Sequence, residues 1–135
     1  MTSDVRLELL NQLIQIFLKL RNDYDTGLMG AIGELYAEVE LGMQKAPRGT
    51  PGYDGLIGDR RVTVKSKEKV DKPTVAYAYI RNNAIGLADD LLLVQMDEHG
   101  TLIHYLAPLD RLVGRRVKGG VRYYLSEIIA LNKRL

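Results

Sequence analysis

The residues best suited to chemistry flank Gly58-Asp59, a two-residue turn signal between two strand-like segments. Pairing residues outward from this turn places Asp54 opposite Thr63. Because side chains two positions apart in a strand share a face, we expect Asp54, Thr63 and Lys65 on one face of the hairpin. A carboxylate and a lysine in this arrangement can hold a divalent cation and set an ammonium beside an attacking water, the minimum for metal-assisted phosphodiester hydrolysis. The alternative is an ordinary cross-strand surface pair.

The elements that must position these residues follow from the spacing of apolar residues. Spacings of three and four predict helices over residues 4–22 and 28–42. A last helix is expected from Ser126 to about Lys133. Strands are predicted over residues 53–57, 60–67, 74–81, 91–96 and 102–106. This order of helices and strands predicts an α+β (compact α/β) fold, with a mixed sheet and flanking helices.

Length and composition restrict the class of protein. The chain has 135 residues, 46% hydrophobic and 27% charged, which predicts one folded domain over residues 1–135. It contains no cysteine, which excludes disulfides and thiolate metal sites and favours a cytoplasmic location. No apolar run approaches the roughly 20 residues needed to span a bilayer, so we expect no membrane association.

Basic residues gather near the C-terminus. Residues 111–135 hold seven Lys or Arg against one acidic residue, a net charge of +6, whereas the whole chain carries +2. A basic stripe beside tyrosines suits phosphate contacts and base stacking. The residues expected to contact nucleic acid are Arg115, Arg116, Lys118 and Arg122, beside Tyr123 and Tyr124. The alternative is a solvated basic terminus without a ligand.

The first predicted helix is apolar on more than one side. Val5, Leu7, Ile16 and Leu18 extend its surface beyond a single stripe. A helix of this kind packs on two sides, and a homodimer interface is one way to provide the second side. In the second helix, the glycines spaced by three over residues 27–33 predict close approach to a neighbouring element.

The order of motifs resembles that of the PD-(D/E)XK nuclease superfamily, which has a restriction-endonuclease-like fold. The Gly-Glu-x-x-Ala stretch of the family's helix is matched by residues 33–37, and the Gly/Pro loop and metal-binding aspartate by Gly52-Tyr53-Asp54. The acid-x-Lys position reads Thr63-Val64-Lys65, and residues 91–94 resemble a later buried strand. The resemblance covers about residues 28–107, with the helix at 4–22 as an addition.

The resemblance implies that Asp54 and Glu34 bind Mg²⁺ and that Lys65 orients or polarises the attacking water. It also implies that the Val64 carbonyl is a further ligand. Thr63 stands where the family normally has a second metal-binding acid, which predicts weaker metal affinity and a supporting role for the threonine.

Other residues could take these roles. Glu38 and Glu68 are further candidates for the missing acid. A shifted register would make Lys67 the catalytic lysine, but it would put Lys65 at the acid position and is therefore chemically worse.

The motifs and the basic segment together predict two alternative functions. The first is a small Mg²⁺-dependent nuclease that acts on DNA or RNA, with the basic segment at 111–135 binding the backbone. The alternative is a protein of the same fold that has lost catalysis and acts as a nucleic-acid-binding or protein-interaction dimer through its first helix.

Overall fold

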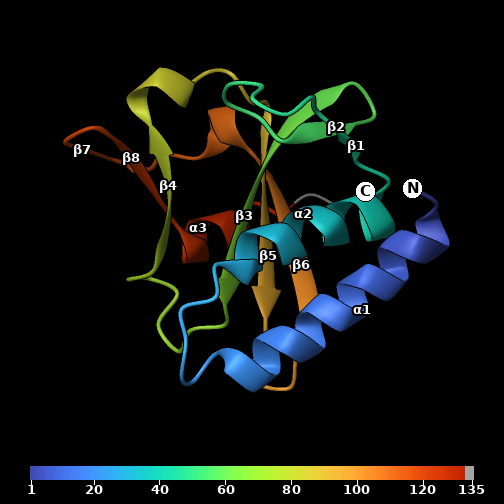
Figure 1. Cartoon of the computed structure of the whole chain (residues 1–135). Helices are drawn as coiled ribbons and strands as arrows, with labels where there is room; N and C mark the ends of the chain where they lie inside the picture. Colours follow the sequence, from blue (N-terminus) through green and yellow to red (C-terminus); the bar gives the residue numbers. More distant parts are fainter. Residues whose placement is uncertain (133–135) are drawn as a thin grey trace.

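The computed structural model describes residues 1–132, which form two β-sheets and three α-helices (Figure 1). The helices are α1 (Ser3–Leu20), α2 (Leu28–Leu41) and α3 (Leu125–Ala130). The strands are β1 (Gln44–Lys45), β2 (Gly55–Ile57), β3 (Arg60–Glu68), β4 (Tyr77–Arg81), β5 (Asp90–Met96), β6 (Leu102–Pro108), β7 (Arg115–Val117) and β8 (Gly120–Tyr124). Short 3-10 turns follow β4 at Asn82–Ala84 and β6 at Leu109–Arg111. The predicted α+β class with a mixed sheet and flanking helices is confirmed.

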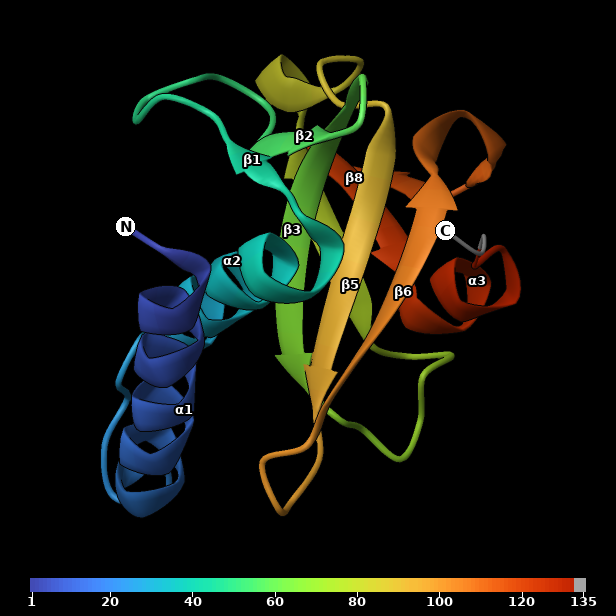
Figure 2. The same ribbon diagram turned by 90° about the vertical axis from the view of Figure 1, so that its right-hand side faces the viewer.

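The larger sheet has five strands in the order β1-β2-β3-β5-β6. Strands β3 and β5 are parallel, and all other neighbours in this sheet are antiparallel. Between these two parallel strands the chain leaves the sheet and forms β4, which belongs to a second sheet with the order β4-β8-β7. Figure 2 shows α1 and α2 on one side of the large sheet and α3 on the other side.

Two apolar cores lie on the two faces of the large sheet. Leu92 and Val94 of β5 belong to the core shared with α1 and α2. Leu91 and Leu93 of the same strand belong to the core shared with the second sheet and α3. All four side chains are fully buried, which explains why this strand reads as a continuous apolar run.

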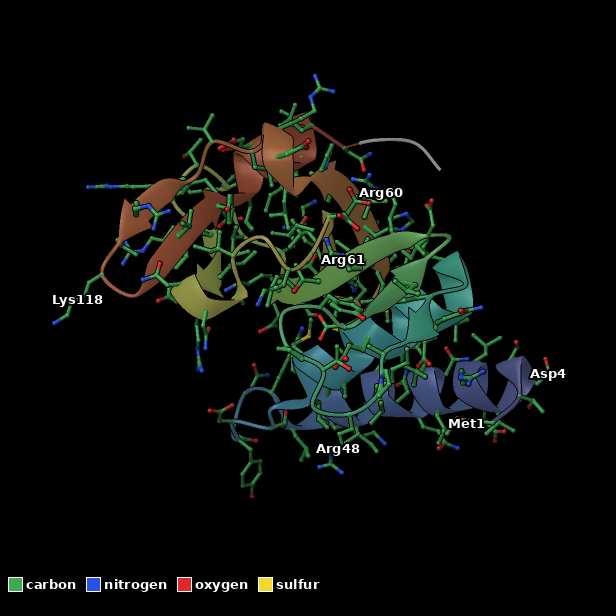
Figure 3. The ribbon with its side chains drawn as sticks, turned by 90° about the horizontal axis from the view of Figure 1, so that it is seen from above. Met1, Asp4, Arg48, Arg60, Arg61 and Lys118 are labelled. Carbon is green, nitrogen blue, oxygen red and sulfur yellow. The ribbon has the colours of Figure 1, made fainter. Side chains whose placement is uncertain are left out.

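Ion pairs tie the start of β3 to the start of β5. Arg60 donates two hydrogen bonds to the Asp90 carboxylate, both at 2.8 Å, and Asp90 is 1% exposed. The side chain of Arg61 pairs with Asp89 at 3.2 Å (Figure 3 labels both arginines). These pairs and the parallel ladder hold β3 firmly against the buried strand β5.

Helix α1 lies along α2 as the outermost layer (Figure 2). Leu10 and Phe17 are its buried side chains, whereas Val5 and Ile16 are 44% and 46% exposed. The apolar surface predicted outside the main stripe is therefore present. Homodimer formation through this surface remains a prediction.

The basic segment differs from the sequence prediction. The sequence predicts no strand after residue 106 and a last helix from Ser126 to about Lys133, but residues 115–124 form the β7–β8 hairpin and α3 spans Leu125–Ala130. The turn of this hairpin contains Gly119, which has a φ of +89°. Its strands are only three and five residues long, and apolar alternation is confined to Val121 and Tyr123 of β8, which is too short a pattern to predict a strand. Lys133 and Arg134 lie outside the described residues.

Within residues 1–132, no helix has the length and apolar character needed to cross a bilayer.

Candidate active site

The predicted hairpin places Asp54 beside β3. Residue Gly55 pairs with Val62 in the antiparallel register expected from the Gly58-Asp59 turn. Asp54 precedes the first residue of β2, and its N–H also turns to the Val62 carbonyl, at 2.8 Å, so the regular ladder stops at the Gly55–Val62 pair. The predicted register therefore holds over Gly55–Ile57, and Asp54 lies next to this ladder without forming the regular pair with Thr63.

The Asp54 carboxylate occupies the edge of β3 beyond the end of β2. Its Oδ2 accepts a hydrogen bond from the Val64 N–H at 2.6 Å, and Oδ1 has no hydrogen-bond partner within residues 1–132. In an antiparallel strand the N–H and C=O of one residue point to the same side, so the Val64 carbonyl faces this edge as well. One carboxylate oxygen and one carbonyl oxygen thus face the same open edge of the sheet.

A cavity of about 460 Å³ opens between the face of β3 and strand β4. Thr63 and Lys65 line it from β3, and Thr63 is only 7% exposed. The remaining lining residues are Asp54 with the preceding loop residues Thr50, Gly52 and Tyr53, and Tyr79, Ile80, Arg81 and Ala84 from β4 and its 3-10 turn. The three hairpin residues predicted to act together therefore share one cavity.

Lys65 is a half-buried lysine without an ion pair or hydrogen bond among the described residues. Burial lowers its pKa, and the positive charges of Lys67 and Arg81 lower it further, whereas Asp54 opposes the change. Its neutral form is therefore more accessible than that of an exposed lysine. Such an amine is suited to accept a proton as well as to contact a phosphate.

Glu34 reaches this region from the opposite face of the sheet. Gly33 packs α2 directly against β3, where an added Cβ would lie 1.7 Å from Ser66 Oγ. The pKa of Glu34 is raised by burial and by the negative charges of Asp54 and Glu38, so the Glu34 and Asp54 carboxylates act on each other. Because α2 packs on the other face from Thr63 and Lys65, we place this interaction around the edge of β3.

Glu34 does not line the 460 Å³ cavity. It lines a neighbouring groove with Arg6, Glu38 and Lys45, and the charge of Lys45 lowers its pKa in opposition to Asp54. The carboxylate is half-buried and forms no ion pair or hydrogen bond among the described residues. Glu34 is thus close enough to Asp54 for their negative charges to repel each other, but it lies at the rim of the site.

The two other acids considered for the site are engaged elsewhere. Glu38 pairs with Arg6 at 3.6 Å, and Glu68 pairs with Arg21 at 3.2 Å. Neither lines the cavity beside Asp54. In the part of the chain that the structure describes, no group of three or more His, Asp or Glu side chains gathers as a metal site. A cation at this edge would therefore rely on Asp54, Glu34 and backbone oxygen.

The two histidines are not paired with each other. His104 Nδ1 lies 2.7 Å from the Tyr36 hydroxyl, and burial lowers the pKa of His104. His99 lies in the β5–β6 turn and contacts Glu98 at 3.3 Å. His104 therefore links α2 to β6 as a structural residue.

The predicted nucleic-acid contacts separate onto different sides of the second sheet. Arg115 and Arg122 are paired across β7 and β8 and face away from the core, whereas Arg116 points to the other side and donates to Asn82 Oδ1 at 3.4 Å. Lys118 lies at the hairpin tip and points away from the rest of the molecule (Figure 3). Tyr123 is 8% exposed and belongs to the apolar core, so its expected stacking role is wrong.

Two polar side chains that line the cavity were not predicted from the sequence as site residues. Tyr79 and Arg81 of β4 line the cavity opposite Lys65, although nothing in the local pattern indicates that β4 lies beside β3. The only available signal was the alternation of Tyr77, Tyr79 and Arg81, which predicts that these side chains share a face.

A larger cavity of about 580 Å³ lies at the junction of α1 and α2. Its charged residues are Arg21 and Glu68, which pair with each other, and Asp23 and Asp25, which are exposed, whereas Asp54 and Lys65 are half-buried. The site around Asp54 and Lys65 is therefore the better candidate for catalysis. No protein-family model matches the chain, and no curated protein matches it either.

Proposed function

We propose that this protein is a Mg²⁺-dependent nuclease that hydrolyses phosphodiester bonds at the edge of β3. One observation carries the proposal: Glu34, Asp54 and Lys65 are half-buried charged side chains, and none forms an ion pair among the described residues. Half-buried charges are costly unless they are paired. A cation between the carboxylates and a phosphate beside the lysine would supply the missing partners.

The donor set fits Mg²⁺. Asp54 Oδ1, the Glu34 carboxylate and the Val64 carbonyl would hold the ion, which suits a metal that keeps several waters and uses one or two carboxylates. Bound Mg²⁺ would polarise the phosphoryl oxygens and lower the pKa of a bound water. Thr63 offers a hydroxyl instead of a third carboxylate, so metal affinity is expected to be low.

The side chains around the cavity divide the remaining work. Lys65 orients the attacking water and, as a neutral amine, takes its proton as the water oxygen bonds to phosphorus. The bond from phosphorus to the leaving oxygen breaks in the same displacement, and a solvent water protonates that oxygen. Arg81 lies across the cavity, where its guanidinium is placed to bind a phosphate. The resemblance to PD-(D/E)XK nucleases, carried by residues 33–37, Asp54 and Lys65, supports the same assignment.

The second candidate is a nucleic-acid-binding or protein-interaction dimer that has no activity. The observation that favours it is Thr63, which stands where the PD-(D/E)XK nucleases normally have an acid. The site is left with two carboxylates, Asp54 and Glu34, and Glu34 lies at its rim.

A cleavage assay separates the two candidates. Wild type, Asp54→Asn and Lys65→Ala are incubated with plasmid, single-stranded DNA and RNA in Mg²⁺ or Mn²⁺. Exposed residues near the hairpin supply matched controls, Asp59→Asn and Lys69→Ala. We expect metal-dependent cleavage that both site variants lose and both controls keep. Absence of cleavage by wild type on every substrate would refute the nuclease, and cleavage that survives in both site variants would refute the site.

A further inference from the structure

The second sheet presents a continuous set of tyrosines and arginines on the face away from the core. The β4–β8 ladder pairs Tyr77 with Tyr124 and Tyr79 with Arg122, so these four side chains share one face. We define the tyrosine–arginine face as Tyr77, Tyr79, Arg81, Arg115, Arg122 and Tyr124.

This face differs in chemistry from the reverse side of the same strands. Ala78, Ile80, Val121 and Tyr123 point inward and are buried in the apolar core. The side chains of the tyrosine–arginine face are half-buried or exposed, and its members include three cations and no acid. Its charge is complementary to a polyanion, and its rings provide stacking surface.

The rings of this face are held in place by their neighbours. Tyr77 and Tyr124 are packed edge to face, with ring centroids 6.3 Å apart and an interplanar angle of 77°. The Arg122 guanidinium lies over the Tyr77 ring, 4.5 Å from its centroid. An arginine stacked on a tyrosine presents a planar cation on which a base can stack in turn.

Tyr79 connects this face to the candidate active site. Its ring lies against the backbone of Gly120, where an added Cβ would come within 2.8 Å of the ring, so only glycine allows this approach. Tyr79 and Arg81 also line the 460 Å³ cavity that contains Lys65.

We propose that the tyrosine–arginine face binds single-stranded nucleic acid and leads it into the cavity at Lys65. Bases stack on Tyr79 and on the Tyr77–Arg122 pair, while Arg81 and Arg115 bind phosphates. A single strand is required because the bases of a duplex are stacked on each other and do not expose their planes. Binding to this face stands alone, whereas delivery to Lys65 rests on the proposed nuclease function.

Binding is measured by fluorescence anisotropy in EDTA, which separates it from metal-dependent cleavage. The probes are end-labelled oligo(dT) and oligo(U) of about 12 nucleotides, a length within the range of known single-strand sites, and a mixed-sequence duplex of equal length. The test variants are Tyr79→Leu, which keeps an apolar side chain, and Arg122→Ala. The matched controls are Tyr24→Leu, at an exposed tyrosine between α1 and α2, and Lys19→Ala, at an exposed lysine on α1. Thermal melting shows that each variant is folded.

We expect wild type to bind at least one single strand more tightly than the duplex. Tyr79→Leu should weaken binding at least about five-fold, the lower end of the effect of one stacked base. Arg122→Ala should also weaken binding, because it removes the planar cation that lies over the Tyr77 ring and on which a base stacks. Both controls should bind as wild type.

The result distinguishes the face from the nuclease. Duplex binding as tight as single-strand binding, or wild-type binding by both folded test variants, would overturn the proposal for the face even if the protein cleaves nucleic acid. Single-strand binding that falls in both variants supports the face even if wild type shows no cleavage, in which case only the nuclease is refuted.

Discussion

The Asp54 carboxylate accepts the Val64 N–H at 2.6 Å and so takes the place of a neighbouring strand at the edge of β3. Strand β2 begins only at Gly55, so the part of β3 that continues past Val62 to Glu68 has no strand beside it on this edge. The open edge exposes backbone oxygen next to a carboxylate. The same edge is where Glu34 and Asp54 interact and beside which Lys65 enters the cavity. The end of one short strand thus creates the candidate site.

Two substitutions of Asp54 separate its structural role from its proposed chemical role. Asp54→Asn keeps an oxygen acceptor for the Val64 N–H, whereas Asp54→Ala leaves that N–H without its partner. In urea unfolding we expect Asp54→Ala to lower the free energy of unfolding by about 1–2 kcal/mol, the size expected for a partly exposed hydrogen bond to a charged acceptor. Asp54→Asn should lower it less, because the amide oxygen can still accept from the Val64 N–H. Both variants should lose metal-dependent activity. If Asp54→Ala is as stable as wild type, the hydrogen bond contributes nothing to folding.

Glu34→Gln should reveal the cost of placing Glu34 beside Asp54. Because the folded state raises the pKa of Glu34 above its ordinary value of 4.5, the folded protein binds more protons just above that pH, and stability falls as pH rises through the raised pKa. In EDTA at pH 7 the glutamine variant should therefore melt at a higher temperature than wild type, and the difference should vanish below the ordinary pKa. Mg²⁺ should stabilise wild type more than the variant.

Glu40→Gln, at an exposed position on the same helix, provides the control for Glu34→Gln. It should show neither the pH-dependent gain in melting temperature nor the loss of Mg²⁺ stabilisation. If Glu34→Gln and Glu40→Gln respond identically to pH and to Mg²⁺, Glu34 does not belong to the site.

Lys65→Met should have the opposite dependence on pH. Burial lowers the pKa of Lys65 from 10.5, so the protonated lysine destabilises the fold at neutral pH, and this penalty is relieved as pH rises from the lowered pKa towards 10.5. The methionine variant should be more stable than wild type at pH 7, and its advantage should shrink over the alkaline range in urea titrations. The exposed Lys69→Met is the control. A constant advantage across that range would contradict a lowered pKa.

Thr63→Asp tests whether the site is a metal site that lacks one acid. Thr63 is 7% exposed, so the new carboxylate should destabilise the metal-free protein by about 1–3 kcal/mol. It should also tighten Mg²⁺ or Mn²⁺ binding, because added ligand charge raises cation affinity, and this appears as a larger metal-induced increase in melting temperature. Thr63→Asn introduces a side chain of similar size without the charge. If Mg²⁺ or Mn²⁺ raises the melting temperatures of Thr63→Asp and Thr63→Asn equally, the edge of β3 does not bind metal.

A double-mutant cycle at Gly33 and Ser66 tests the contact that sets the distance between α2 and β3. Ser66 Oγ is buried without a hydrogen-bond partner in the described chain, so Ser66→Ala should stabilise the protein by about 1 kcal/mol. Gly33→Ala should destabilise it by about 1–3 kcal/mol, because the new Cβ would overlap Ser66 Oγ. The cost should be smaller when Ser66 is alanine. Additive effects in the cycle would mean that the two residues do not control the packing.

Local patterns in the sequence were sufficient for the elements that depend on nearby residues. The Gly58-Asp59 turn determined the register that pairs Gly55 with Val62 and so brings Asp54 beside β3, and apolar periodicity located α1 and α2 within about two residues at each end. The continuous apolar run at 91–94 correctly indicated a strand buried on both faces. Each of these features depends on side chains that are neighbours along the chain.

Tertiary structure alone decided which distant elements meet. Strand β4 pairs with β8 in a second sheet, so Tyr79 and Arg81 face Lys65 across a cavity that no local pattern indicates. The same pairing turns Arg122 outward and buries Tyr123. Glu34 approaches Asp54 from the other face of the large sheet because Gly33 allows α2 to pack closely on β3. The physical reason is that strand pairing and helix packing minimise the exposed apolar surface of the whole chain, whereas periodicity reports only the face on which each residue lies.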